Sequence, residues 1–244
     1  MKIVVLASKE VGSKCVGELL NQGYLISRIL TEPCDKEIIA LAESNCIETV
    51  LFPEALSWLE SQEHEAFDWL INLWSSRILT ETQLNKAKYK MNLHPSYVPH
   101  CLGSDTATWT LLTDAPVGVS ILDMSPRVDE GGVYVTKKLD RVYPERAVDL
   151  QQRLKKASVD LFSQQVGAVL SGETPSVPLS EIKSKFRRSE TVNSQLKNIA
   201  ELTTDQKAFL DWVLAHDFSE DTQAGIQIGD KIIRLQVAIE HAGE

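Results

Sequence analysis

The segment "KIVVLASKEVGSKCVGELLNQGYLISRILT" at residues 2–31 sets the pattern for the first half of the chain. Residues 2–8 form a short run rich in β-branched residues, which is typical of a strand covered on both faces. Apolar residues at helical spacing follow in residues 10–23, where Gly23 is a typical helix stop. A second apolar stretch occupies residues 24–31. The segment therefore predicts a strand, a helix and a second strand.

The same alternation continues along the chain. We expect helices at 36–45 and 53–62 and strands at 47–52 and 67–74. Such alternation predicts a parallel sheet with right-handed crossovers, and ligands of these sheets bind beyond the carboxyl ends of the strands.

The second half predicts more varied elements. These are a helix at 81–88, strands at 89–94, 115–125 and 131–140, a helix at 106–114 and a long amphipathic helix at 147–170. Residues 171–178, "SGETPSVP", have the composition of a linker. We therefore predict an α/β fold: a Rossmann-like core with a mostly parallel sheet in residues 1–175, and a small C-terminal α+β appendage in residues 176–244.

Within the appendage, residues 191–216 have a helical pattern, and the part from 203 opens on a threonine cap. Residues 224–239 alternate as two strands around Gly229 and Asp230, which predicts a hairpin. We expect His216 at the surface. A subdomain of this size is marginal alone, so it should pack on the main domain.

Charge and cysteine usage exclude several classes of protein. The formal net charge is -9, and the one basic run is "KSKFRR" at residues 183–188, so broad nucleic-acid binding is not expected. The four cysteines lack metal-site or disulfide spacing, which predicts no metal centre and a reduced, cytoplasmic environment. No apolar run reaches membrane-spanning length, and the N-terminal one is too short for a signal sequence.

A candidate site lies where two predicted strands end. Asn92 and His94 are two residues apart on an extended strand, so their side chains share one face. Asp129 lies in the loop after a later strand and is followed by Gly131 and Gly132, which permit unusual backbone angles and close approach of a ligand. An amide, an imidazole and a carboxylate at one sheet edge are suited to acid–base chemistry.

The chain resembles the 10-formyltetrahydrofolate-dependent formyltransferases. The resemblance rests on "NLHPSYVP" at 92–99, "GVSI" at 118–121 and "DEG" at 129–131, in that order, and covers roughly residues 1–175. It implies a formyltransferase core and N10-formyltetrahydrofolate as formyl donor. It also implies that Asn92 and His94 hold the oxyanion of a tetrahedral intermediate and that Asp129 accepts the amine's proton.

The same resemblance suggests where the two substrates bind. The donor would lie against a group of residues near the strand ends, namely Leu73, Trp74, Arg77, Val128 and Gly131. The tail is similar to that of sugar-nucleotide N-formyltransferases, in which Lys185, Arg187 and Arg188 would meet a pyrophosphate. The acceptor would then be an amino sugar carried on a nucleotide diphosphate, and a homodimer stays open.

Two departures from the family pattern keep alternatives open. Leu122 stands where many relatives carry histidine, and Leu102 precedes Gly103 where the family often has arginine. The alternatives are formylation of another amine, such as an aminoacyl group on a carrier or tRNA or glycinamide ribonucleotide, and a non-catalytic protein that binds folate or a nucleotide.

Overall fold

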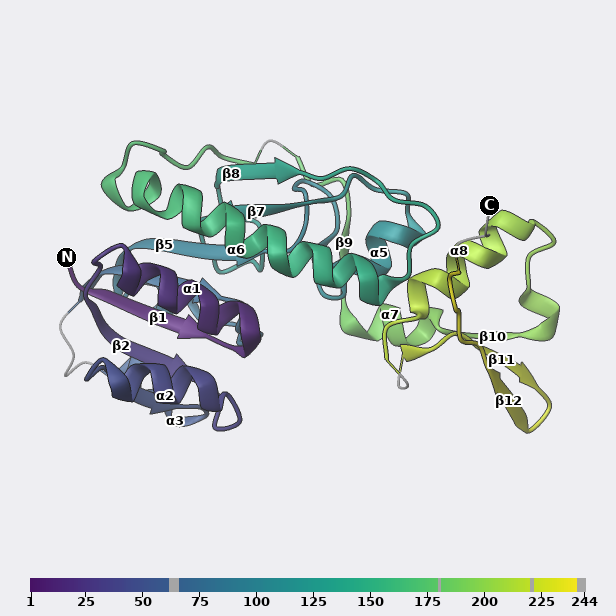
Figure 1. The fold of residues 1–244 in the computed structure, drawn as a ribbon, viewed down its shortest axis with the longest axis horizontal. Helices are drawn as coiled ribbons and strands as arrows, with labels where there is room; N and C mark the ends of the chain where they lie inside the picture. The colour runs from purple at the N-terminus through teal and green to yellow at the C-terminus, as the bar shows by residue number, and fades with distance from the viewer. Residues whose placement is uncertain (62–65, 180, 220–221, 241–244) are drawn as a thin grey trace. The chain divides into compact units, whose positions relative to one another are not determined.

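The computed structural model describes residues 1–61, 66–179, 181–219 and 222–240, and its first half alternates strands and helices as the sequence predicts. In chain order the elements are β1 Ile3–Ala7, α1 Lys9–Asn21, β2 Ile26–Thr31, α2 Lys36–Ser44, β3 Glu48–Leu51, α3 Glu54–Glu60 and β4 Phe67–Leu73 (Figure 1). The last residue of the helix expected at 53–62 lies outside the described part of the chain.

The second half of the core contains α4 Glu81–Leu84, β5 Ala87–His94, β6 Leu102–Gly103, α5 Thr106–Leu112, β7 Gly118–Leu122, β8 Val133–Lys138 and α6 Ala147–Ser171. The helix expected at 81–88 is wrong in its second half. A capping box between Thr80 and Gln83 starts α4, but the helix stops at Leu84. Ala87 already pairs with Phe67 of β4, so sheet pairing ends the helix early.

Among the described residues the main sheet has seven strands in the order β3-β2-β1-β4-β5-β7-β8. The pairs from β3 through β5 are parallel, and β7 pairs antiparallel with β5. This confirms the expected mostly parallel sheet. It also places the carboxyl ends of β4 and β5 side by side, beyond which ligands of such sheets bind.

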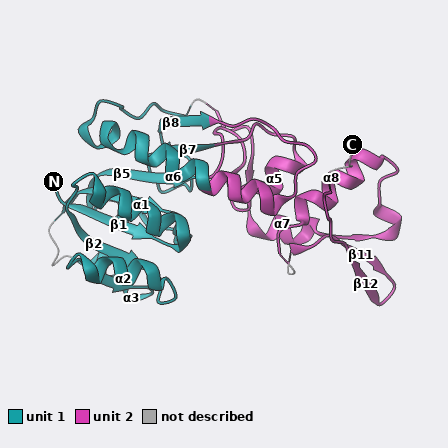
Figure 2. Ribbon diagram, viewed as in Figure 1, with its two compact units in different colours: residues 1–94, 119–137, 156–180 teal, residues 95–118, 138–155, 181–244 magenta. Residues whose placement is uncertain are grey.

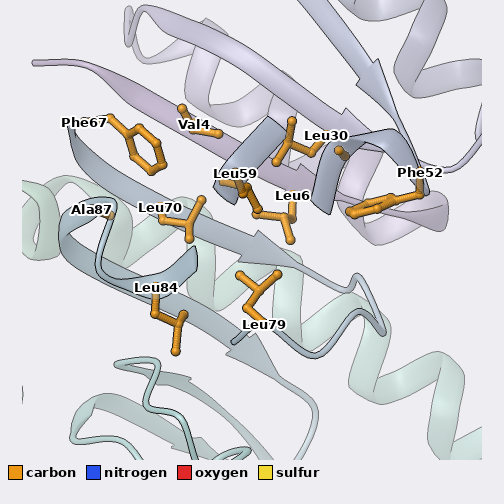
Figure 3. Packing of buried hydrophobic residues seen from close by; sticks show 11 residues of the cluster. Val4, Leu6, Leu30, Phe52, Leu59, Phe67, Leu70, Leu79, Leu84 and Ala87 are labelled. Carbon is orange, nitrogen blue, oxygen red and sulfur yellow. The ribbon is translucent and has the colours of Figure 1, made fainter. Parts of the chain in front are cut away.

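An apolar cluster joins the strands to α3 and α4 (Figure 3). Val4 and Leu6 of β1 pack there with residues of the neighbouring strands. Ile3 and Val5 point to the other face and are also fully buried. The central strand is therefore covered on both faces, as the β-branched run predicts.

The chain divides into two compact units that are not continuous in sequence (Figure 2). Unit 1 consists of residues 1–94, 119–137 and 156–180, and unit 2 of residues 95–118, 138–155 and 181–244. The division into domains at residues 1–175 and 176–244 stays a prediction. No helix within the described part of the chain is both long and apolar enough to cross a membrane.

The C-terminal elements are β9 Lys185–Phe186, α7 Arg188–Ser194, β10 Leu196–Asn198, the 3-10 helix η1 Ile199–Glu201, α8 Gln206–His216, β11 Gly225–Ile228 and β12 Lys231–Arg234. The hairpin of β11 and β12 confirms the sequence pattern. The continuous helical pattern at 191–216 is wrong, because β10 pairs with β11 and interrupts it. The cap of α8 is Asp205, not a threonine, and its carboxylate accepts the N–H of Ala208 at 3.1 Å.

His216 is buried, which contradicts its expected place at the surface. Its side chain lies in unit 2 with no exposed area. Nδ1 lies 2.8 Å from the carbonyl oxygen of Trp212, and Nε2 lies 2.9 Å from the hydroxyl of Ser194. A carbonyl oxygen can only accept, so Nδ1 carries a hydrogen. The Ser194 hydroxyl that contacts Nε2 also donates to the carbonyl of Thr191 at 2.9 Å.

Candidate active site

The carboxyl end of β5 carries the Asn-x-His pair. Asn92 lies opposite Asn72 of the parallel neighbour β4, and His94 lies opposite Ser120 of the antiparallel neighbour β7. Because alternate strand residues share a face, Asn92 and His94 project to the same side of the sheet. All of these residues belong to unit 1.

The loop between β7 and β8 carries Asp129. The N–H of Asp123 donates to the carbonyl of Gly132 at 2.7 Å, and the N–H of Glu130 donates to the carbonyl of Arg127 at 3.1 Å. These bonds pin both ends of the loop and form a turn within it. Asp129 itself has a φ of 58°, in the left-handed region that aspartate tolerates better than most residues.

Gly131 is required by the loop's own backbone. A Cβ added at this position would lie 1.9 Å from the carbonyl oxygen of Asp123, so a side chain there would move the loop. The group that approaches Gly131 closely is thus the backbone of the chain itself. A contact between Gly131 and the formyl donor stays a prediction.

The predicted trio comes together at one carboxylate oxygen. Asn92 Nδ2 donates to Asp129 Oδ1 at 3.0 Å, and His94 Nδ1 lies 3.6 Å from the same oxygen. The side chains of His94 and Asp129 are only 6% and 7% exposed. Burial strengthens the electrostatic interaction between the ring and the carboxylate because water screens it less.

His94 keeps one ring nitrogen without a hydrogen bond. Its Nε2 atom is buried and has no hydrogen-bond partner among the described residues. A buried polar group left in this way costs about 1–3 kcal/mol, so such a group often serves a ligand. With Nδ1 turned to Asp129, Nε2 is the nitrogen left for a substrate, and it can donate to a substrate oxygen when both ring nitrogens carry a hydrogen. The site thus brings an amide, an imidazole and a carboxylate together. Their roles as oxyanion donors and proton acceptor stay predictions.

The residues predicted at the end of β4 have different environments. The side chain of Leu73 is fully buried. Trp74 has a φ of 65°, which is strained for a bulky residue, and its buried Nε1 has no hydrogen-bond partner within the described ranges. Arg77 is held by Glu32 through bonds of 2.7 and 2.8 Å, and it lies 4.9 Å from the centre of the Phe52 ring. Arg77 is thus already paired with a carboxylate.

Leu122, where relatives often carry histidine, is a packing residue here. It lies opposite Asn92 in the sheet and is fully buried. Next to it, burial raises the pKa of the Asp123 carboxyl, and the charge of Lys90 partly offsets this. Burial likewise raises the pKa of Tyr134, whose hydroxyl donates to the carbonyl of Lys90 at 3.1 Å. Val128 is half-buried beside Asp129 in the same loop.

The basic residues predicted to bind the acceptor belong to unit 2. Lys185 is in β9 and is exposed. Arg187 caps α7, and its N–H donates to the carboxylate of Glu190 at 2.6 Å. Arg188 forms an ion pair with Asp105. Their roles in binding stay predictions.

Sequence reasoning missed Asn72, which contacts the trio. Its Nδ2 atom donates to Asn92 Oδ1 at 3.1 Å. The signal that could have found it is the cross-strand register, because Asn72 faces Asn92 only once β4 and β5 are known to be neighbours. The local pattern of residues 67–74 does not indicate a functional role for Asn72.

The fold and site together define a class: an α/β protein that holds an amide, an imidazole and a carboxylate together at the carboxyl end of a central strand, an arrangement suited to acid–base chemistry. The formyl transferase family model matches residues 1–166, which is more than half of the chain. The chain belongs to this family and is a formyltransferase enzyme.

Solved structures share the fold over nearly the whole chain. A sugar N-formyltransferase from a Shewanella species matches with a TM-score of 0.80 and 14% identity, covering 100% of this chain and 99% of its own. A 4-N formyltransferase from Francisella tularensis matches with a TM-score of 0.81 and 13% identity, covering 99% and 98%. An N-formyltransferase from Helicobacter canadensis in complex with folinic acid and dTDP-3-aminofucose matches with a TM-score of 0.73 and 17% identity, covering 94% and 84%. At these identities the likeness shows the fold.

Proposed function

We propose that this enzyme transfers a formyl group from N10-formyltetrahydrofolate to a primary amine of a nucleotide-linked amino sugar. The observation that carries the proposal is the convergence of Asn92 and His94 on one oxygen of Asp129. The family match supports formyl transfer. The Helicobacter structure, with its folate compound and its nucleotide-linked amino sugar, supports this choice of donor and acceptor.

The arrangement suits each step of the reaction. The amine lone pair attacks the formyl carbon and forms a C–N bond, which leaves a negative charge on the formyl oxygen. Asn92 Nδ2 and His94 Nε2 donate to that oxygen, and one such donor typically lowers the barrier by about 3 kcal/mol. Asp129 takes the amine's proton, directly or through a water. The oxyanion then re-forms the C=O bond as the bond from carbon to N10 breaks. N10 takes the proton that Asp129 had accepted, directly or through a water, and a formamide and tetrahydrofolate leave.

The residues at the end of β4 fit a donor that is aromatic and carries polar edges. Trp74 offers an aromatic surface and an indole N–H without a hydrogen-bond partner in the described residues. Leu73 and Gly131 are buried and Val128 is half-buried, and we assign all three to the same donor site. The guanidinium of Arg77 is already paired with Glu32. We therefore propose that Arg77 fixes the loop after β4 through this ion pair.

For the acceptor, we propose that Lys185, Arg187 and Arg188 contact the diphosphate. The ion pair of Arg188 with Asp105 is at the surface, where such pairs contribute little and exchange readily. We expect Arg187→Glu to raise the KM for the acceptor at least tenfold and to leave kcat nearly unchanged, because phosphate binding is uniform between ground and transition state. Steady-state kinetics on the acceptor would show this, and an unchanged KM would remove Arg187 from the binding site.

The proposal is tested with a panel of nucleoside diphosphate amino sugars. Each is incubated with enzyme and N10-formyltetrahydrofolate, and mass spectrometry should detect the gain of one CO in at least one of them. Controls omit the donor or replace the enzyme by Asp129→Asn. A verified donor that gives no product with any acceptor of the panel would contradict the proposed acceptor class. Formylation of a different amine would show that the acceptor belongs to one of the alternative classes.

A non-catalytic protein that binds folate or a nucleotide is less consistent with this geometry. Such a protein has no need to keep an amide and an imidazole against one buried carboxylate. It would bind the donor and leave every acceptor unchanged, which the same panel detects.

A further inference from the structure

Asn72 links the loop after β4 to the catalytic trio. It lies opposite Asn92 across the β4–β5 pair, and its Nδ2 donates to Asn92 Oδ1 at 3.1 Å. It also makes two bonds to the backbone of Ser75. The N–H of Ser75 donates to Asn72 Oδ1 at 3.1 Å, and Asn72 Nδ2 donates to the carbonyl of Ser75 at 3.2 Å.

These bonds fix the orientation of two amides in turn. A backbone N–H can only donate and a backbone carbonyl can only accept, so Ser75 decides which end of Asn72 is the oxygen. Asn72 must then present its NH₂ group to Asn92. Asn92 in turn must present its oxygen to Asn72 and its NH₂ group to Asp129.

Asp129 cannot hold Asn92 in this orientation throughout the proposed reaction. As a carboxylate it accepts only, so it favours the NH₂ group of Asn92. Once Asp129 has taken the amine's proton it also carries an O–H. That O–H could donate to Asn92 in the flipped orientation, in which the Asn92 amide turns its oxygen, and not its NH₂ group, toward Asp129. Asn72 supplies the second restraint. In the flipped orientation the NH₂ group of Asn92 would face the NH₂ group of Asn72, and two donors cannot form a hydrogen bond at any stage of the reaction.

We propose that Asn72 is a positioning residue that keeps the NH₂ group of Asn92 on the reacting side of the site. The inference rests on the proposed formyl transfer and goes beyond it by assigning a residue outside the trio. Asn72 acts on the reacting oxygen through Asn92, so its loss should affect the transition state more than substrate binding.

The variant Asn72→Asp tests this most directly. The new carboxylate can still accept from the Ser75 N–H but can no longer donate to the Ser75 carbonyl. It repels the oxygen of Asn92 and attracts its NH₂ group. We expect kcat to fall about 100-fold or more, as when one oxyanion donor is lost. The KM for the donor should change much less. Asn72→Ala provides a second variant without the added charge, and a smaller loss of kcat in the same direction is expected.

A double variant separates positioning from general stability. If Asn72 acts through Asn92, Asn72→Asp combined with Asn92→Ala should be no slower than Asn92→Ala alone. A merely structural role would instead lower the thermal midpoint and multiply the two losses. Asn45→Asp makes the same chemical change at the exposed end of α2 and should leave kcat unchanged.

The inference is overturned if both folded Asn72 variants keep kcat within about threefold of an active wild type, or if their losses multiply with that of Asn92→Ala. Wild-type enzyme that formylates no acceptor would overturn the proposed function itself, and this inference with it. The two failures are thus distinguished by the activity of the wild type.

Discussion

At the scale of single residues, the account depends on one carboxylate oxygen. Asp129 Oδ1 accepts a hydrogen bond from Asn92 and lies near His94. Asn92 and His94 come from one face of β5, and Asp129 comes from the loop between β7 and β8. Their types and the spacing of Asn92 and His94 could be read from the sequence. Their convergence could not be derived from spacing alone, because it depends on the path of the loop at 123–132.

Replacing this carboxylate should affect turnover more than binding. We expect Asp129→Asn to lower kcat by about 100-fold or more, because the amine then lacks its proton acceptor. The KM for the donor should change little. Glu130→Gln is the matched control, since it makes the same change one residue away, where Glu130 pairs with Arg127. Equal rates for the two variants would show that Asp129 does not take part.

The buried His216 should make stability depend on pH. Burial lowers its pKa, the hydrogen bond to the Trp212 carbonyl partly offsets this, and nearby Lys197 lowers the pKa further. The folded state therefore takes up a proton less readily than the unfolded chain, in which histidine titrates at about 6.5. The unfolded state therefore binds more protons just below that value, and stability is full above it and falls as the pH falls. Thermal midpoints of the wild type should drop more between pH 7 and pH 5 than those of His216→Gln. Identical slopes would show that His216 does not contribute.

At the scale of elements, the sequence predicts the parallel strands of the first half and their helices well, and it predicts the short strands poorly. The first half follows hydrophobic alternation, so β1 to β4 and their helices were predictable. Within the described ranges, the two-residue strands β6 and β9 pair only with each other, across a long sequence separation. Residues 196–198 have a helical pattern yet pair with β11. In both cases a distant backbone partner decides the structure, and a local pattern cannot reveal it.

The loop between β7 and β8 should tolerate no side chain at Gly131. We expect Gly131→Ala to displace the loop and lower kcat by about 100-fold, the effect of misplacing a reacting group by an ångström. The cause is the Asp123 carbonyl, 1.9 Å from the added Cβ.

The matched control is Gly17→Ala in α1, where an added Cβ meets nothing within 4 Å. It should keep activity and stabilise the fold by about 0.5–1 kcal/mol. Full activity of Gly131→Ala would show that the loop has room to adjust.

At the scale of the whole molecule, the predicted division at residue 175 and the two compact units assign residues differently. Unit 2 combines the C-terminal residues with residues 95–118 and 138–155. Within it, α5 packs on α8, and Leu112 packs on the cluster around Trp212. The C-terminal part therefore contributes to the stability of residues that precede the linker.

Removing residues 176–244 should therefore destabilise what remains. The truncated chain 1–175 loses the partners of Leu112 and of β6, and each apolar side chain that becomes exposed costs about 1.5–3 kcal/mol. We expect a lower midpoint in urea unfolding than for the full chain. A midpoint equal to that of the full chain would show that residues 1–175 form an independent domain.

The most direct test of the central claim is the rate of formyl transfer by Asn92→Ala, His94→Ala and the double variant, each shown to be folded by circular dichroism. Because both donors stabilise the same oxyanion, we predict that each single change lowers kcat by about 100-fold or more and that the double loss is smaller than the product. A folded His94→Ala enzyme with the wild-type kcat would contradict the account.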